Sequence, residues 1–548
     1  MIRKWLLSLL VFLALGGPLH AQTEAEPTIT LPATTVTLSQ VFEQLRKAGY
    51  TLSYGNNIDL DQKVSYTQRS LKLKALLKET GKAAGLGFRQ KDKKLIVYRK
   101  PTAQVDPDAP KVTLSGYIRD AANGEELIGA TVYLNELAIG TTSNIYGFYS
   151  ITVPAGSYTV SYRFIGYQTQ EKPMDLTTAT TFNIELPGSK TALQEVEITA
   201  EKDDEALTEV QMSMERLDIK TVEEIPQFLG ETDIIRSVLM LPGVATVGEG
   251  TSGFNVRGGA VDQNLILLDE ASVYNSSHVF GFFSVFNSDA IKGLELYKGG
   301  IPARYGGRLS SVMDVRQKEG NSKGFSGRGG ISVLSSRLTV EGPLKKGKSS
   351  FMVSGRRSYG DLFLKLSPSL RDNTAYFYDL NLKVNHKFDD KNRLFLSGYF
   401  GRDVWKFGED FASDWGNSTA TVRWNHLFND RLFSNFTYVF SNFTYSLGVP
   451  TGSDAFDWDS KIVNHNLKAD FSYFPSPRHT IEFGLNTMFY RFTPGDVRGI
   501  GEGSIFNDIS IAREHALRPA LYASDEFRVN ERLTLQAGLR LSLFMNMG

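Results

Sequence analysis

The sequence lacks cysteine altogether, although the chain has 548 residues. This absence excludes disulfide scaffolds, cysteine-ligated metals, iron–sulfur clusters, thiol catalysis and a lipid-modified N-terminal cysteine. An excess of one charge sign is also missing, because 60 Lys and Arg residues balance 60 Asp and Glu residues, and this argues against a nucleic acid partner. Glycine (50 residues), Phe (35) and Tyr (23) are abundant instead, and they favour a mainly β protein of several domains.

Long apolar runs are missing except at the start of the chain. Arg3 and Lys4 precede an apolar run over residues 5–15, which is well short of the about 20 residues that a membrane-spanning helix needs. A Gly-Gly-Pro break at 16–18 and the small residue Ala21 complete the pattern of a secretory signal peptide over residues 1–21. An exported chain of this kind is periplasmic, secreted or a membrane β-barrel.

Residues 29–100 predict a small α+β domain. Thr37 is a good N-cap for one helix that ends near Gly49, and Ser70 for a second helix that ends near Gly85. Strand-like sequence flanks each helix, so two similar units indicate an internal duplication. The pattern resembles the short N-terminal domain shared by secretins and signalling TonB-dependent receptors, and an unrelated α+β domain is the alternative.

Residues 101–111 are rich in Pro and Asp and predict a linker, and residues 112–187 predict a small β-sandwich. Glycines punctuate its short strands where a turn with positive φ is expected. These glycines are Gly124, Gly129, Gly140, Gly147 and Gly156. The strings GATV, GTTSNIYGFY, PAGSY and FIGY resemble the carboxypeptidase regulatory-like domain, which is a non-catalytic sandwich despite its name.

Residues 188–208 predict a second linker that carries a short extended segment. Val196, Ile198 and Ala200 alternate with polar residues between polar flanks, so a strand here has no obvious sheet of its own and can add to the sheet edge of another protein. The segment resembles the TonB box of outer-membrane receptors, and the last strand of the sandwich is the alternative. The residues expected to bind a TonB-type protein are Glu195, Val196, Glu197, Ile198, Thr199 and Ala200.

Residues 209–320 carry the most specific motifs of the chain. The strings FNVRGG, LILLDEASVYN and AIKGLELYKGGIPARYGGRLSSVMDVR resemble, motif by motif, the plug domain of TonB-dependent receptors. An α/β plug is therefore expected, with glycines where the backbone passes close to barrel walls. The residues on the family's motifs are Arg257, Gly258, Gly259, Lys298, Gly299, Gly300, Arg304, Tyr305, Gly306 and Gly307.

Residues 324–548 predict part of a transmembrane antiparallel β-barrel, because apolar and polar residues alternate with period two over 380–385, 466–473 and 533–543. Tight turns near 389–392, 429–430, 475–477 and 530–531 alternate with longer loops near 408–417, 448–460 and 494–514. This asymmetry is typical of outer-membrane barrels rather than of a soluble sandwich. Aromatic residues near strand ends are expected in interfacial girdles: Phe388, Phe428, Tyr473, Phe474 and Trp405.

The barrel region has room for roughly ten strands, whereas plugged transporters of this type close with about 22. A half cylinder would leave two bare strand edges in lipid. The chain also stops at Gly548 without the terminal aromatic residue of the resembled family. We therefore expect the sequence to be a C-terminally truncated fragment.

The resemblances imply a TonB-dependent outer-membrane receptor of a Gram-negative bacterium, with its N-terminal domains in the periplasm. Such a receptor imports a scarce extracellular ligand and is not an enzyme. Its expected partners are a TonB-type energy-coupling protein, outer-membrane lipid, an anti-sigma regulator that the first domain would contact, and a small ligand. A siderophore is the base-rate ligand, with glycans and peptides as rivals. A secretin-type or surface binding module without active transport and a barrel-anchored surface enzyme are the alternatives.

The sequence supplies no catalytic group, cofactor site or metal site. His479 and Glu482 match an H-x-x-E zinc motif, but residues three apart on a strand point to opposite faces. The glycines of 248–253 match a dinucleotide fingerprint without the strand and helix that it requires. Ligand-binding residues cannot be assigned. Candidate ligand contacts in the loops, for which loop packing or a membrane interface is the alternative, are Trp405, Phe407, Phe411, Trp415 and Trp458.

Overall fold

The structure is a computed structural model that describes residues 27–54, 58–91, 93–99, 109–137, 139–189, 213–223, 230–248, 253–501, 504–530 and 533–548. Residues 1–104 and 105–548 form two separate compact units. The predicted signal peptide and the TonB-box segment 195–200 lie outside the described residues, as does most of each predicted linker. Among the described residues, no helix is long and apolar enough to cross a membrane.

The first unit contains two strand–helix–strand repeats in the predicted order. Thr37 caps the first helix, because its hydroxyl accepts a hydrogen bond from the Gln40 N–H at 3.4 Å and the Gln40 side chain accepts one from the Thr37 N–H at 3.1 Å. The prediction that Ser70 caps the second helix is wrong, because Ser70 lies in a strand and Lys72 occupies the cap position. The elements are β1 (Thr28–Thr30), β2 (Thr35–Thr37), α2 (Leu38–Lys47), β3 (Thr51–Tyr54), β4 (Lys63–Ser65), β5 (Ser70–Lys72), α3 (Leu73–Ala84), β6 (Leu86–Lys91) and β7 (Lys94–Arg99).

The sandwich is made of one sheet in the order β10-β9-β12-β13 and a second in the order β11-β8-β14, with β15 also beside β8. Apolar side chains of both sheets form its core. Gly124, Gly129 and Gly147 have the predicted positive φ, whereas Gly140 and Gly156 lie in strands. The strands are β8 (Lys111–Asp120), β9 (Thr131–Leu134), β10 (Ile139–Thr142), β11 (Phe148–Pro154), β12 (Gly156–Arg163), β13 (Gln170–Leu176), β14 (Thr180–Thr181) and β15 (Ile184–Leu186).

The plug is a five-stranded mixed sheet in the order β16-β23-β24-β19-β20, flanked by short helices. Two small hairpins, β17 with β18 and β21 with β22, project from it. The elements are β16 (Met214–Asp218), α5 (Ile219–Glu223), α6 (Ile234–Leu239), β17 (Val244–Thr246), β18 (Phe254–Val256), η1 (Val261–Gln263), β19 (Asn264–Leu268), β20 (Ala271–Ser272), β21 (Ser277–His278), η2 (Val279–Gly281), β22 (Phe283–Ser284), β23 (Ile291–Tyr297) and β24 (Ser311–Gln317).

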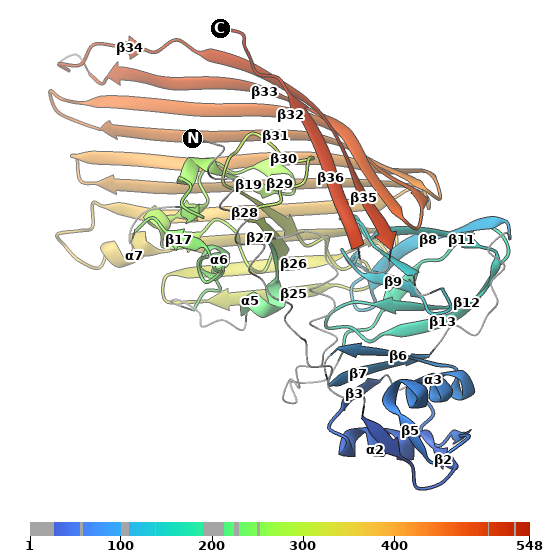
Figure 1. Cartoon of the computed structure of the whole chain (residues 1–548). Coiled ribbons are helices and arrows are strands. Elements are labelled where there is room, and N and C mark those ends of the chain that lie inside the picture. The colour runs from blue at the N-terminus through green and yellow to red at the C-terminus, as the bar shows by residue number, and fades with distance from the viewer. Residues whose placement is uncertain are drawn as a thin grey trace, which may run out of the picture. The chain divides into compact units, whose positions relative to one another are not determined.

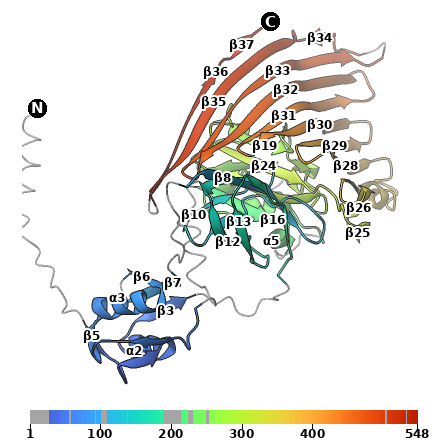
Figure 2. The same cartoon turned by 90° about the vertical axis from the view of Figure 1, so that its right-hand side faces the viewer.

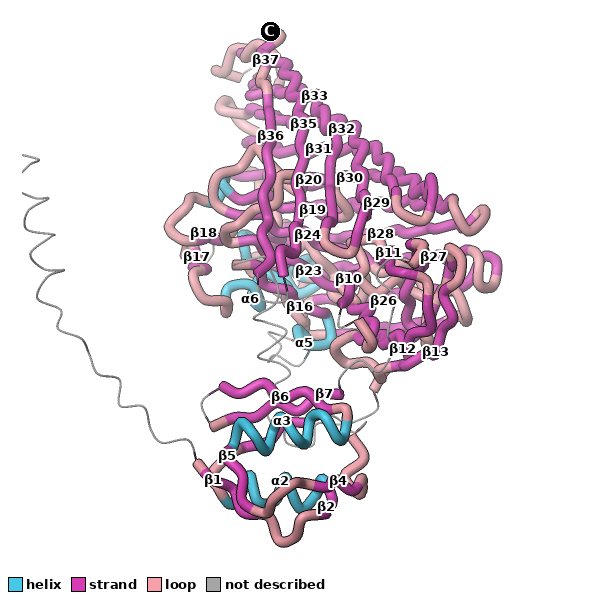
Figure 3. The backbone as a smooth tube through the Cα atoms, turned by 45° about the vertical axis from the view of Figure 1, so that its right-hand side comes forward, coloured by secondary structure: helices cyan, strands magenta, loops and turns pink. Residues whose placement is uncertain are grey.

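The remaining residues form one 13-stranded antiparallel sheet, which curves around the plug (Figures 1 and 2). Strands dominate the backbone, as the sequence predicts for a mainly β chain (Figure 3). The elements are β25 (Ser326–Ile331), β26 (Ser335–Lys345), β27 (Ser349–Ser358), α7 (Gly360–Leu364), β28 (Thr374–Lys387), β29 (Asn392–Phe407), β30 (Phe411–Asn429), β31 (Leu432–Val449), β32 (Phe456–Ser476), β33 (His479–Gly499), β34 (Ile509–Ser510), β35 (Glu514–Asn530), β36 (Leu533–Ser542) and β37 (Met545–Asn546).

Connections at one end of this sheet are tight, and we call that end the short-turn rim. It contains the turns at 388–391, 430–431 and 477–478. The opposite end has the longer connections at 359–373 and 450–455 and the segment between Gly499 and Glu514. The predicted long loop at 408–417 is wrong, because β29 and β30 stay paired as far as Phe407 and Phe411. Residues 411–417 instead lie on β30, and only 408–410 connect the two strands.

Candidate functional site: the plug against the strand wall

The two faces of the 13-stranded sheet have opposite chemistry. On β28, Asp379 and Lys383 contact the plug and are 3% and 2% exposed, whereas Leu380 between them is 48% exposed on the other face. We call these the inner and outer faces. Large apolar side chains that are exposed on the outer face include Leu382, Leu396, Phe400, Val422, Leu467, Leu485, Leu521 and Leu539. Polar residues inward and apolar residues outward are the arrangement of a transmembrane barrel wall, as predicted.

Three of the five predicted girdle aromatics lie on the outer face. Phe388, Phe428 and Tyr473 are exposed there, close to the short-turn rim. Phe474 and Trp405 contradict the prediction. Phe474 is buried against the sandwich, and the Trp405 ring contacts Phe280 of the plug. Successive residues of a strand face opposite sides of the sheet, and both residues occupy positions whose side chains point inward.

Two of the predicted plug motifs hold the start of the plug. The Arg257 guanidinium donates to Ser213 Oγ at 2.8 Å, and the Lys298 backbone N–H donates to Ser213 O at 2.9 Å. The Lys298 ammonium also donates to Glu215 Oε1 at 3.0 Å and to Pro242 O at 2.9 Å. Because Ser213 is the first described residue after the second linker, these motifs fix the point where that linker enters the plug.

The glycines of these two motifs serve turns and close packing within the plug. Gly258 and Gly300 have φ of 81° and 59°, which side chains rarely adopt. A Cβ at Gly299 would lie 2.7 Å from Arg257 Nη1, so the two motifs pack on each other. The nearest neighbours of Gly259 and Gly299 therefore belong to the plug, whereas those of the third motif belong to the wall.

The third motif lies against the wall. Arg304 Nη1 is 3.4 Å from Glu482 Oε1 on β33, and its guanidinium lies 5.0 Å from the centre of the Tyr305 ring. The Tyr305 hydroxyl donates to Asp314 Oδ2 at 2.8 Å within the plug. Burial raises the pKa of the Tyr305 hydroxyl well above its usual range, so it remains a donor. Arg304 thus links the plug to the inner face.

Gly306 and Gly307 allow the wall to approach the plug backbone, as predicted for this motif. A Cβ at Gly306 would lie 2.5 Å from Arg540 Nε, and one at Gly307 would overlap the Arg518 guanidinium. Arg518 donates to Gly306 O at 3.3 Å. Arg540 donates to Arg304 O at 3.1 Å. Wall arginines from β35 and β36 therefore bind main-chain carbonyls that side chains would cover.

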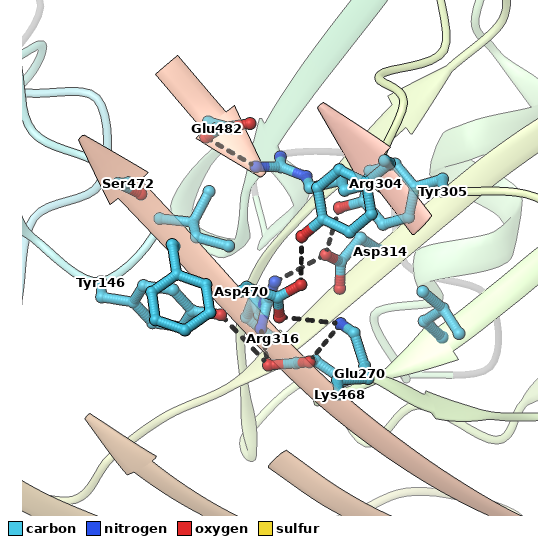
Figure 4. A pocket seen from close by; sticks show the side chains of 14 residues that line it. Tyr146, Glu270, Arg304, Tyr305, Asp314, Arg316, Lys468, Asp470, Ser472 and Glu482 are labelled. Carbon is cyan, nitrogen blue, oxygen red and sulfur yellow. Dashed lines mark hydrogen bonds and ion pairs between the residues drawn. The ribbon is translucent and has the colours of Figure 1, made fainter. Parts of the chain in front are cut away.

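An acidic turn that the sequence analysis did not single out forms a second attachment. Asp269 and Glu270 follow β19 with φ of 47° and 72°. Asp269 reaches Lys383 of the wall at 2.5 Å, and Glu270 reaches Lys468 at 2.5 Å. Figure 4 shows the Glu270–Lys468 pair. Burial opposes ionisation of Glu270, but Lys468 and Arg316 outweigh it and lower its pKa to about 2. Two acidic residues directly after a buried strand, within the quoted LILLDEASVYN string, are the signal that could have identified them.

His278 makes a third attachment, which the sequence also does not reveal. Its Nδ1 lies 2.6 Å from Asp403 Oδ2 and its Nε2 3.4 Å from Asp379 Oδ2, and its ring stacks on Phe377 at 4.4 Å. Arg356 lies 2.7 Å from the same Asp379 oxygen. Burial favours the neutral imidazole, but the carboxylates of Asp403 and Asp379 outweigh it and raise the pKa of His278.

An aromatic cluster lies near the ends of β29 and β30 away from the short-turn rim. Phe280 of the plug lies 4.8 Å from the Trp405 ring and 4.9 Å from the Trp415 ring. Val279 and Phe280 both have φ near 50°, which costs roughly 1–3 kcal/mol each and projects the Phe280 ring. Among the described residues, the indole N–H groups of Trp405 and Trp415 have no hydrogen-bond partner.

The aromatics predicted to lie in loops are therefore on strands instead. Trp405 and Phe407 end β29, Phe411 and Trp415 begin β30, and Trp458 belongs to β32. Trp405, Phe407 and Phe411 lie in ring contact, at 6.0 and 6.2 Å. The strand pairing brings four of the five together.

Comparison with known families agrees with the domains inferred from the motifs. Residues 114–198 match the model of the CarboxypepD_reg-like domain, and residues 209–312 match the TonB-dependent Receptor Plug Domain. The first match extends into the segment 195–200 that resembles a TonB box. No curated protein sequence matches the chain significantly.

Solved structures that match this chain include two siderophore receptors and a copper transporter. A ferric enterobactin receptor mutant, PfeA, of Pseudomonas aeruginosa has 15% identity, with 61% of this chain and 58% of that chain covered and a TM-score of 0.47. The siderophore receptor PirA of Acinetobacter baumannii has 15% identity, 61% and 57% coverage and a TM-score of 0.47. The copper transporter OprC has 10% identity, 60% and 54% coverage and a TM-score of 0.46. The chain thus spans a little over half the length of these structures. Because the TM-scores are below 0.5, the fold is assigned from the strand pairing and the family matches instead.

Proposed function

We propose, from the premise that this chain is a TonB-dependent receptor, that it imports an extracellular ligand across the outer membrane of a Gram-negative bacterium. The observation that carries the proposal is the attachment of the plug at two ends. Arg257 and Lys298 hold the point where the linker enters, and Arg304 lies against the wall. A pull on the linker would therefore load the plug and its wall contacts.

Energy for this movement would arrive by protein contact, because the outer membrane has no ATP. We infer that residues 195–200 add as a strand to a TonB-type protein in the periplasm, since main-chain pairing supplies affinity without a preformed pocket. The short distance in sequence from this segment to Ser213 supports the inference. The alternating sequence is compatible with a strand of the sandwich as well, so the experiment below compares the two.

The chemistry of the plug–wall contact favours a movable plug. Its closest contacts are charged or polar, including Asp269 with Lys383, Glu270 with Lys468 and His278 with Asp403. Buried ion pairs add little net stability, because desolvation offsets their attraction. Water that enters during movement can solvate the separated charges, whereas an apolar contact of the same size would resist separation.

We infer that the aromatic cluster of Phe280, Trp405 and Trp415 contacts the ligand. The Phe280 side chain is 43% exposed, and its flat ring suits a ligand with apolar faces. Siderophores, glycans and aromatic peptides all meet this description. Growth of a deletion strain on ferric siderophores, on glycans and on peptides as sole sources decides among them, because only the imported class should fail to support growth.

The direct test of energy coupling is cysteine cross-linking, for which the cysteine-free chain is a clean background. Ile198→Cys in the full-length receptor should form a disulfide with a single cysteine in the strand-binding region of the TonB-type protein. Val196→Pro should abolish that cross-link, because proline cannot donate to an added strand. Thr178→Cys, at an exposed position of the sandwich, is the matched control. Equal cross-linking at both positions would contradict the proposal.

The first domain is proposed to transmit ligand binding to an anti-sigma regulator. Deleting residues 29–100 should leave uptake intact and abolish the ligand-induced transcript. Loss of uptake in this deletion would contradict a signalling role. The plug match favours transport over a secretin-type module, which shares only this first domain, and over a barrel-anchored enzyme.

A further inference from the structure

We propose that the carboxypeptidase regulatory-like sandwich is a gate that closes the short-turn rim beneath the plug and must leave this rim before the passage opens. The inference rests on the proposed function for its biological meaning, but its contacts stand independently. It concerns one sandwich loop, residues 143–147, the outer side of β11, and the two acidic residues of the turn after β8.

Tyr146 of this loop joins all three parts of the second unit. Its hydroxyl donates to Glu270 Oε1 of the plug at 3.4 Å (Figure 4). The same hydroxyl accepts from Asn435 Nδ2 of the wall at 2.5 Å. Its ring stacks on Phe433 at 5.3 Å and lies 5.1 Å from the Arg423 guanidinium. Tyr146 is only 7% exposed, so the contact excludes water.

The sandwich strand β11 uses its two faces differently. Tyr149, Ile151 and Val153 lie in the sandwich's own core, whereas Phe148 packs on Phe433 and Phe474 of the wall at 5.5 and 6.1 Å. The core of the sandwich is formed by other side chains, and Phe148 lies outside it. A large aromatic residue on its second face is explained by docking to the rim.

Polar contacts continue the docking onto the turn at 430–431. Ser150 Oγ donates to Asp430 O at 2.6 Å, and Ser115 Oγ lies 3.4 Å from Asp430 Oδ1. The Arg431 guanidinium donates to Thr113 Oγ1 at 2.9 Å. Residues of β8 and β11 therefore bind the sandwich to a tight turn of the wall.

A second patch binds the plug base. The Glu319 N–H donates to Glu125 Oε1 at 2.6 Å, Lys292 of the plug donates to Glu126 O, and the Glu126 carboxylate pairs with Arg393 of the wall. Burial raises the pKa of Glu125, which is 7% exposed, consistent with a water-free contact. The sandwich is thus fastened to the plug and the wall at once.

A small cavity lies where the sandwich, the plug and the wall meet. Its lining includes Tyr146 and Ile145 of the sandwich, Glu270 and Arg316 of the plug, and Lys468 and Asp470 of the wall (Figure 4). The charged groups that hold the plug turn are therefore covered by sandwich side chains on the rim side. Undocking would admit water to Glu270 and Lys468 and weaken this attachment of the plug.

The linker after the sandwich joins the sandwich to the plug. A force that a TonB-type protein applies to this linker would therefore act on both domains. Its described ends are Ser189, just after β15, and Ser213, just before β16. Force applied between these ends is shared by sandwich and plug. The gate would accordingly hold the receptor closed at rest and be released by the same partner.

The test is a reversible covalent lock in the full-length receptor. Ser115→Cys with Asp430→Cys should oxidise readily in outer-membrane vesicles, measured by gel mobility. The matched control is Ser157→Cys with Asp175→Cys, which replaces the same residue types within the sandwich, where Ser157 Oγ and Asp175 Oδ1 lie 3.1 Å apart. Poor oxidation of the first pair in folded receptor would overturn the docking.

A second experiment tests function. Force is applied to a biotin-acceptor peptide inserted at residue 203, and the KCl conductance of a bilayer that contains the receptor is recorded. Pulling should open the wild type and the oxidised control pair, whereas the oxidised Ser115–Asp430 pair should stay closed until a reductant is added. Opening of the locked receptor at the wild-type force would overturn the gate. A missing TonB cross-link at Ile198 would instead overturn energy coupling, so the two failures are distinguishable.

Discussion

At the scale of single residues, His278 makes the plug–wall contact sensitive to pH. Its imidazole faces Asp403 and Asp379 on the wall, with the Arg356 guanidinium behind Asp379. Because the folded-state pKa is raised, the stabilisation is fully present below the ordinary His pKa of about 6.5 and is lost as pH rises through the raised value. His278→Gln should therefore cost stability near about pH 6, by about 3 kcal/mol if the aspartates are left unpaired, and much less near about pH 9.

The measurement is the melting temperature of the detergent-solubilised receptor across this pH range. His479→Gln is the control, since His479 also pairs with an aspartate, Asp525 at 2.7 Å, but is 36% exposed. Its melting curve should differ little from wild type at either pH, because exposed pairs contribute at most about 1 kcal/mol. A deficit of His278→Gln that does not change with pH would show that the imidazole keeps one charge state over this range, and would contradict the pH dependence.

At the scale of elements, β16 is the strand that a pull on the linker reaches first. Among the described residues, it lies at the edge of the plug sheet and pairs with β23. The Lys298 ammonium helps to hold it, because this group binds Glu215 Oε1 and Pro242 O. Lys298→Met should lower the free energy of local opening of residues 214–218 by about 1–3 kcal/mol, because hydrogen bonds to a charged group are lost. Hydrogen exchange of the peptide that contains β16 measures this opening.

Lys387→Met is the matched control, because Lys387 also pairs with a carboxylate, Asp390 at 2.5 Å, but at an exposed turn of the wall. It should leave exchange of β16 unchanged. Equal protection of β16 in wild type and Lys298→Met would show that the Lys298 ammonium does not hold the strand, and that the Lys-Gly-Gly motif has another purpose.

Elements whose signals are local were predictable, and those set by distant partners were not. Thr37 caps its helix with Gln40 three residues away, whereas Ser70 was drawn into β5 by pairing with Thr30. The motif residues around Arg257 and Arg304 were identified from sequence because each lies in a short contiguous string that resembles a plug-domain motif. The wall partners of Asp269 and His278 lie more than one hundred residues away, and no local pattern marks them.

At the scale of the whole molecule, the inner and outer faces of the 13-stranded sheet are stable in different surroundings. Inner-face carboxylates and ammonium groups are buried against the plug, whereas large apolar side chains cover the outer face. Such an apolar band is stable in lipid and would aggregate in water. The period-two alternation predicted this wall because each strand carries it locally. The contact between the sandwich and the rim was not predicted, since Phe148 and Tyr146 resemble ordinary strand and turn residues in the sequence.

Charge placed on the outer face tests whether this band lies in lipid. Leu467, near the middle of β32, is 59% exposed on that face, and Ile165 of the sandwich is 67% exposed to water. Leu467→Arg should destabilise the full-length receptor by about 2–4 kcal/mol in urea refolding with phospholipid vesicles, because arginine is costly near the bilayer midplane. Ile165→Arg, the same charge at similar exposure, should change stability by less than about 0.5 kcal/mol. If both variants were equally harmless, the outer face would not contact lipid, and the sheet would not be a transmembrane wall.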